Sequence, residues 1–242
     1  FKSEGTLSFL INQELLKYYN HFRYMKHCKV LPIKSWQTHD WLLKKHYARR
    51  IPSISFSFGL FENNILEGVI TFGKPPSMSL CIGVCGKDNS DYVFELNRLC
   101  LQSNKPNHAS YLVANAMKQL PKPIIVVSYA DTSANHTGYI YQACNFIYTG
   151  LSDKRTEWRE KNSNRHSKTL CDQTSLEERK ANPNKYEVVD RPRKHRYVFF
   201  VGNKKHKTNF LKNLNYKIMP YPKGNNKKYN SGKSLPTQQN LF

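Results

Sequence analysis

The spacing of apolar and polar positions predicts two helices near the start of the chain. Residues 14–24 carry apolar or aromatic side chains at helical intervals, which is typical of a short amphipathic helix. A second helix is predicted over residues 35–47, with Trp36, Leu42 and Leu43 on its buried side. After this helix the period of the apolar positions changes.

Shorter apolar runs then predict strands that alternate with further helices. The predicted strands cover residues 54–60, 64–72, 80–84, 92–101, 124–129, 146–148 and 196–201, and the first two form an antiparallel hairpin. The predicted helices cover residues 109–120, 137–145 and 204–214. This order of elements predicts a mixed α/β sheet.

The composition changes after residue 150 and suggests three regions. Residues 1–150 contain most of the predicted elements, and we expect them to form the catalytic core with its N-terminal helices. Residues 151–219 are richer in charge, include a polar loop at 162–165, and are expected to complete the fold and contact DNA. Residues 220–242 are rich in Asn, Lys, Gly and Pro, which predicts a disordered tail.

The strong positive charge favours a polyanionic partner. Lys and Arg total 38 against 17 Asp and Glu, which gives a formal net charge of +21. No acidic residue follows Asp190, whereas 13 Lys or Arg residues do. Such a surplus supplies sequence-independent affinity for phosphate backbones. The alternative is a basic tail that serves only solubility or a ribosomal-type role.

Composition also limits the class of protein and the compartment. Aromatic residues make up 13% of the chain, enough for a buried core, and no run approaches the roughly 20 apolar residues of a membrane span. The start lacks a signal peptide and an initiating Met, so we expect a trimmed chain in the cytoplasm. The six cysteines are expected to be reduced thiols, because Cys81 and Cys85 have no second pair at zinc-site spacing.

The segment 92–150 contains the arrangement with the strongest chemical meaning. A predicted strand runs into the loop Gln102–Asn107, and a helix starts near His108 or Ala109. Free backbone amides at a helix start suit a pyrophosphate, although most units of this kind bind nothing. The following residues 124–150 resemble the closing half of acyltransferases of the GNAT superfamily, with Asn145 where that superfamily has glycine.

This resemblance implies a mixed, mostly antiparallel GNAT-like sheet flanked by helices, here with a basic C-terminal extension. It also implies that residues 92–101 and 124–129 are neighbouring parallel strands. The expected cofactor is acetyl-CoA or a related acyl-CoA. The loop lacks the Gln/Arg-x-x-Gly-x-Gly/Ala pattern that is usual in the superfamily.

Within the superfamily the chain is most similar to the Mom family of phage DNA-modification proteins. The similarity spans roughly residues 36–223 and rests on short motifs in a fixed order: 45–47 with Pro52, 95–99, 107–112, 128–131, 136–143, 194–198 and 220–223. It implies an enzyme that converts adenine in double-stranded DNA to N(6)-carbamoylmethyladenine and so protects phage DNA from host restriction.

Four residues are candidates for the chemistry on adenine. The amine of adenine is a poor nucleophile, so an enzyme must orient it and remove a proton. His46 is the candidate base, with a pKa expected near neutrality, and Tyr47 could stack on the base or donate a proton. Asp131 could accept a hydrogen bond from the adenine amine, and Tyr139 could protonate a leaving thiolate. The structural alternatives are a surface histidine, core packing and a turn cap.

Four further residues are candidates for holding the cofactor. Asn107 and Ser110 lie at the predicted helix start, where Ser110 could donate to a phosphate or simply cap the helix. Tyr141 is the alternative to Tyr139 as the acid, because residues two apart on a helix point to different faces. Arg98 could face the cofactor or pair with Glu95.

A base within a duplex hides its reactive atom, so we expect adenine to be extruded while basic residues hold the flanking phosphates. The candidate DNA-binding residues are Arg191, Arg193, Lys194, Arg196, Lys204, Lys205 and Lys207. Any one of them could instead belong to a solvated charged surface.

The route to the modified base stays open at this point. Simple acyl transfer would leave a carbonyl on the adenine nitrogen, whereas a carbamoylmethyl group is joined through its methylene. A redox metal such as iron could take part, and His46, His108 or His136 could bind it, but the metal is unassigned. The alternatives are an acetyltransferase of RNA or protein amines and a non-catalytic DNA-binding protein.

Overall fold

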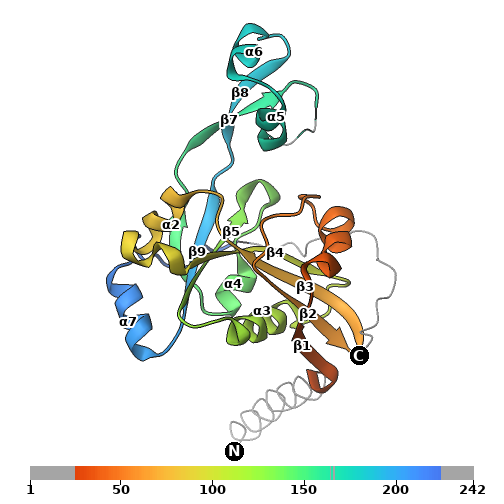
Figure 1. The fold of residues 1–242 in the computed structure, drawn as a ribbon, viewed down its shortest axis with the longest axis vertical. Coiled ribbons are helices and arrows are strands. Elements are labelled where there is room, and N and C mark those ends of the chain that lie inside the picture. The colour runs from red at the N-terminus through yellow and green to blue at the C-terminus, as the bar shows by residue number, and fades with distance from the viewer. Residues whose placement is uncertain (1–24, 164, 166, 225–242) are drawn as a thin grey trace, which may run out of the picture.

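The computed structural model describes residues 25–163, 165 and 167–224 and contains a seven-stranded sheet (Figure 1). Its strand order is β1-β2-β3-β4-β5-β9-β6. The strands are β1 (Cys28–Pro32), β2 (Phe56–Glu62), β3 (Ile65–Gly73), β4 (Val93–Leu101), β5 (Ile124–Asp131), β6 (Ile147–Leu151) and β9 (Lys194–Val201). Within this sheet β4 and β5 are parallel, and the other neighbours are antiparallel. The fold is therefore the mixed, mostly antiparallel sheet that the sequence predicts.

Helices cover both faces of the sheet. They are α2 (Met78–Cys85), α3 (His108–Gln119), α4 (Tyr139–Ala143) and α7 (Lys204–Lys212). Buried residues of α3 join one cluster with side chains such as Val126, and residues of α2 and α7 join a second with Ile125 and Val127. This alternation along β5 follows from the period of two in a strand. Helices α3 and α4 thus lie on one face, and α2 and α7 on the other.

The segment between β1 and β2 contains two short helices, η2 (Ser35–Thr38) and η3 (Trp41–Lys45), which pack against strands β2, β3 and β4. Trp41 packs against Val69 and Cys100 in a third buried cluster. Cys100 and Leu99 are neighbours on β4, and Leu99 packs on the α3 side. The helix η3 therefore lies on the face opposite α3.

A smaller unit is inserted between β6 and β9. It consists of the antiparallel pair β7 (Arg155–Glu160) and β8 (Tyr186–Arg191) with α5 (Ser167–Gln173) and α6 (Leu176–Ala181). Figure 1 shows it projecting from the sheet at the top of the view. After this unit the chain returns as β9, which lies between β5 and β6.

Two predictions from the sequence differ from the structure, and some elements are missing from the predictions. Residues 80–84 belong to helix α2 rather than a strand, since a short apolar run fits a buried helix equally well. Residues 35–47 do not form one helix but a 3-10 segment followed by a π segment. In this geometry Trp41 is buried, whereas Trp36, which is 67% exposed, and Leu43 are exposed rather than on the buried side. Strand β1 is absent from the predictions, and the predicted helix 14–24 lies outside the described residues.

Glycine-to-alanine changes at two positions test the packing of this fold. Gly138 has φ +79°, and an added Cβ would clash with the ring of Tyr197. We expect Gly138→Ala to lower the free energy of unfolding by about 2–4 kcal/mol, from backbone strain and overpacking. Gly83 lies within α2, and a Cβ added there would contact only the hydroxyl end of Tyr216. We therefore expect Gly83→Ala to raise the free energy of unfolding by up to about 1 kcal/mol.

Urea unfolding of the two variants measures both effects. Equal stability of Gly138→Ala and the unchanged protein would contradict the packing of Tyr197 against this turn. A clear loss of stability in Gly83→Ala would contradict the helical conformation of residues 78–85.

Candidate active site

The parallel strands β4 and β5 separate part-way along their length. They pair only at Val93–Ile125, Phe94–Val126 and Glu95–Val127, although both strands continue for several residues. Just beyond the last pair, the hydroxyl of Ser128 donates a hydrogen bond to the carbonyl of Leu96 at 2.9 Å. A gap therefore opens within the sheet between α3 and α4 on one face and η3 on the other.

A β-bulge next to this gap brings two charged side chains to the same face. Thr71 pairs with Arg98 and Phe72 with Leu96, so Asn97 is the extra residue. The amide of Asn97 is fixed, because it accepts from Thr71 at 2.6 Å and donates to the Ser53 carbonyl at 2.8 Å.

In a regular strand, residues three apart point to opposite faces. Phe94, Leu96 and Leu99 pack against the α3 side of the sheet. Because the bulge adds one residue, Glu95 and Arg98 both lie on the opposite side, beside η3.

The surroundings of Glu95 favour the protonated form of its carboxyl. Burial raises its pKa, and the positive charges of Arg98, Lys194 and Arg191 oppose the rise. No ion pair in the described part of the chain includes Glu95. A carboxyl with a raised pKa at the edge of a gap suits proton transfer.

Arg98 is fixed beside this carboxyl. One of its terminal nitrogens donates to the carbonyl of Asn97 at 2.6 Å, and its buried Nε has no partner among the described residues. Burial lowers the pKa of the guanidinium, while Tyr47 and Glu95 raise it. The side chain is therefore a preoriented donor with an unused hydrogen. It forms no ion pair with Glu95 among the described residues, and its role in facing the cofactor stays a prediction.

His46 and Tyr47 lie at the end of η3 on the same face. Their rings stack with centroids 4.4 Å apart, and Tyr47 is 53% exposed, so it is not a core residue. The Nδ1 atom of His46 accepts from the backbone N–H of Ala48 at 3.1 Å, which leaves the proton of the neutral ring on Nε2.

The pKa of His46 differs from the value expected from the sequence. Burial, and then the charge of Arg98, lower it to about 4 rather than leaving it near neutrality. At neutral pH the ring is uncharged and its Nε2–H is a donor. His46 is therefore better suited to binding or orienting than to accepting a proton.

Of the two tyrosines of α4, only Tyr141 faces the interior. It packs against Phe146 and Tyr197, and burial raises its pKa to about 12 although a hydrogen bond with Ser128 opposes the rise. Tyr139 is 63% exposed. Tyr141 thus approaches the gap from the face opposite Glu95, and the structure favours it over Tyr139.

Asp131 is occupied by local contacts. Its carboxylate accepts from the backbone N–H and the hydroxyl of Ser133, at 3.0 and 2.7 Å, and lies 3.2 Å from Lys194. Burial opposes ionisation, but these partners together lower the pKa of Asp131. The geometry matches the cap that the sequence offered as the alternative, and a role in holding adenine stays a prediction.

The predicted cofactor loop lies at the start of α3. Asn107 has φ 65°, is exposed, and no side chain caps the helix there. The hydroxyl of Ser110 donates to the carbonyl of Asn107 at 3.1 Å. Without a side-chain cap, the first amides of this twelve-residue helix can bind an anion.

Several predicted DNA-binding residues are engaged within the protein. Arg196 is buried, donates to the side chain and carbonyl of Thr149, and lies 3.3 Å from the ring centre of Tyr216. Arg193 donates to the carbonyls of Ser152 and Leu151. Arg196 is therefore held by contacts within the protein, and its role as a phosphate contact stays a prediction.

The remaining predicted basic residues are more accessible. Arg191 lies 3.7 Å from Glu157, and Lys194 is paired with Asp131. Lys204, Lys205 and Lys207 are exposed on α7, and no ion pair within the described ranges includes them. These three lysines form the clearest cationic surface of the predicted set.

The profile of the Mom protein family matches residues 27–223, which is most of the chain. The chain belongs to the Mom protein family. One relative, a protein of Escherichia phage Mu named methylcarbamoylase mom, is 30% identical over 210 residues, covering 82% of this chain and 85% of that protein.

Two of the solved structures that are similar to this chain are acetyltransferases. One is a GNAT-family acetyltransferase from Bacillus cereus ATCC 10987, with 10% identity and a TM-score of 0.39 over 73% of this chain and 99% of that one. Another is a putative acetyltransferase from Salmonella typhimurium with its cofactor acetyl-CoA, with 8% identity and a TM-score of 0.42 over 74% and 96%. In the part of the chain that is described, no helix has the length and apolar character needed to cross a membrane.

The stability of Glu95→Gln tests the buried carboxyl. In the unfolded chain the carboxyl has a pKa near 4.5, and burial raises it in the fold. Its stabilising contribution is therefore complete below about pH 4.5 and is lost as pH rises through the folded pKa. Because glutamine never ionises, Glu95→Gln should be more stable than the unchanged protein at pH 8.

Denaturant titrations at several pH values measure this difference. The advantage of Glu95→Gln should vanish at pH 4 and below, whereas Glu187→Gln, at an exposed position on β8, should show no such dependence. A variant that is less stable than the unchanged protein at pH 8 would contradict the burial of an unpaired carboxylate.

Proposed function

We propose that this protein is a transferase that modifies adenine in double-stranded DNA to N(6)-carbamoylmethyladenine and so protects phage DNA from host restriction. Membership of the Mom family and the phage Mu relative named methylcarbamoylase support DNA modification. The observation that carries the chemistry is the half-buried carboxyl of Glu95, with its raised pKa, at the gap between β4 and β5.

The residues around the gap account for the acceptor half of the reaction. The exocyclic amine of adenine must lose a proton before its nitrogen can carry a new substituent, and this proton transfer is the part of the reaction that side chains at the gap can perform. Glu95 would take that proton in this proposal, in place of His46. Arg98 and the Nε2–H of neutral His46 can stabilise developing negative charge, and exposed Tyr47 can stack on an extruded base.

The opposite face of the gap suits an acyl-CoA. The uncapped start of α3, with Asn107 and Ser110, would hold the pyrophosphate, and the unpaired ends of β4 and β5 would bind the extended arm. When bound, the cofactor would supply an activated two-carbon unit. Tyr141, whose raised pKa keeps its hydroxyl protonated, would donate a proton at this face.

Modification of plasmid DNA tests the proposal. After expression in bacteria, mass spectrometry of nucleosides should show carbamoylmethyladenine with the unchanged protein. Glu95→Gln should lower the modification rate by about a hundred- to ten-thousand-fold, the usual cost of losing a proton-transfer group. Glu187→Gln should modify DNA normally.

A matched pair of tyrosine variants separates the two faces of α4. Tyr141→Phe should reduce modification strongly, whereas Tyr139→Phe should leave it nearly unchanged. Unmodified DNA with modified RNA or protein would favour an acetyltransferase of other amines. Tight DNA binding with no modification of any kind would favour a non-catalytic protein.

The lysines of α7 are proposed to supply sequence-independent affinity for DNA. Reversing Lys204, Lys205 and Lys207 to Glu should weaken binding to all DNA sequences and reduce the salt slope by about 0.9 for each phosphate that the protein no longer neutralises. Coenzyme A affinity, measured by calorimetry, should not change. An unchanged salt slope would make these residues a solubility feature.

A control with the same change in net charge uses exposed lysines away from α7. Lys29→Glu, Lys118→Glu and Lys122→Glu alter β1, the end of α3 and the loop after it. Their combined variant should retain most of the salt dependence. If both triple variants lose it equally, the effect belongs to net charge rather than to α7.

A further inference from the structure

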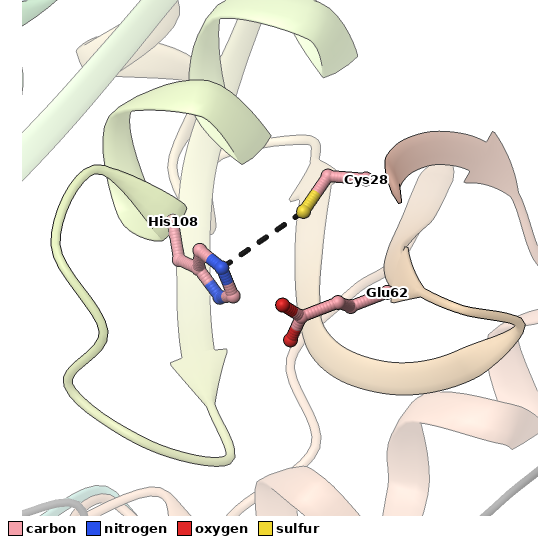
Figure 2. A group of neighbouring side chains, drawn as sticks. All are labelled: Cys28, Glu62 and His108. Carbon is pink, nitrogen blue, oxygen red and sulfur yellow. Dashed lines mark hydrogen bonds between the residues drawn. The ribbon is translucent and has the colours of Figure 1, made fainter. Parts of the chain in front are cut away.

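Three potential metal ligands meet where β1 begins, β2 ends and α3 starts. Cys28 begins β1, Glu62 ends β2, and His108 is the first residue of α3. Cys28 and Glu62 are directly opposite each other across the two strands. Figure 2 shows their side chains and the imidazole ring pointing toward one another.

The ligand atoms are close enough for one ion. The Sγ of Cys28 lies 3.9 Å from Nε2 of His108, and one ligand atom from each of the three residues lies within 4.8 Å of the others. Ligands of a tetrahedral ion at 2.0–2.3 Å are separated by about 3.5 Å, so only a small contraction is needed. Among the described residues this is the single group of three or more such side chains; His46 and His136 are not part of it.

The site is buried, and its surroundings suit a cation. His108 is 1% exposed, and burial lowers its pKa, so the ring is in the neutral form that binds metals. Burial and the charge of Glu62 raise the pKa of the Cys28 thiol, so a metal would displace its proton to solvent. The hydroxyl of Tyr111 donates to the carbonyl of Cys28 at 3.0 Å and fixes the backbone there.

A lysine lies where an incoming cation would compete with it. The ammonium of Lys105 forms an ion pair with one carboxylate oxygen of Glu62, and it is also 4.0 Å from Glu67. When Glu62 binds a metal, Lys105 can keep a carboxylate partner by moving toward Glu67. The loop that contains Lys105 is the one that leads into α3.

We propose that Cys28, Glu62 and His108 bind a divalent transition metal ion of intermediate softness, such as Zn²⁺ or Fe²⁺. A thiolate and an imidazole exclude Mg²⁺ and Ca²⁺ as the preferred ions, while the carboxylate completes a three-ligand set with one open position. The ion joins the paired ends of β1 and β2 to the first residue of α3 and so restrains the loop before that helix.

Cobalt titration tests the site without any need for activity. Metal-free protein should bind one Co²⁺ per chain, with the near-ultraviolet charge-transfer band of a thiolate ligand, and Zn²⁺ should displace it and raise the melting temperature. Cys28→Ser should remove the band, and His108→Gln should weaken binding at least tenfold. Cys171→Ser, at an exposed cysteine, should behave like the unchanged protein.

A second variant keeps the test independent of whether these changes disturb folding. Lys105→Gln removes the competing ammonium and leaves all three ligands, so it should bind Zn²⁺ several-fold more tightly. Elemental analysis of protein purified without added metal distinguishes zinc from iron. Absence of the thiolate band, or Lys105→Gln binding no more tightly than the unchanged protein, would overturn the proposal.

Discussion

The separation of β4 from β5 after the pair Glu95–Val127 is the constraint on which the candidate site depends. Paired strands would fill this space with their own backbone hydrogen bonds. Once they diverge, the sheet has an opening with η3 on one face and α3 and α4 on the other. A donor molecule and an acceptor base can then approach each other from opposite sides, without either crossing the buried core.

The bulge at Asn97 and the burial around it determine which side chains meet at this opening. One extra residue turns Arg98 to the same face as Glu95, and the low-dielectric surroundings raise the pKa of the carboxyl and lower that of His46. Burial of an unpaired carboxylate destabilises the fold at neutral pH. In our account the same burial gives the carboxyl a higher proton affinity, which proton abstraction requires, so the loss of stability accompanies the function.

Much of the fold follows from local pattern, whereas the site depends on contacts between distant segments. The β2–β3 hairpin, α3 and the adjacency of β4 and β5 are predictable, because their apolar periods or motifs are clear. Residues 80–84 are not, since a short apolar run does not distinguish a strand from a buried helix. The sequence suggests Glu95 only as a partner of Arg98, although a Glu and an Arg within an apolar strand are a visible signal. The cluster of Cys28, Glu62 and His108 joins residues up to 80 positions apart, and nothing in their spacing indicates it.

A crystal structure of the protein with coenzyme A is the most direct test of the central claim that donor and acceptor meet through the opening in the sheet. The account predicts pyrophosphate at the start of α3, the extended arm between β4 and β5 beyond the pair Glu95–Val127, and the thiol between Tyr141 and Glu95. Coenzyme A bound elsewhere, or strands that close and pair as far as Leu101, would contradict it.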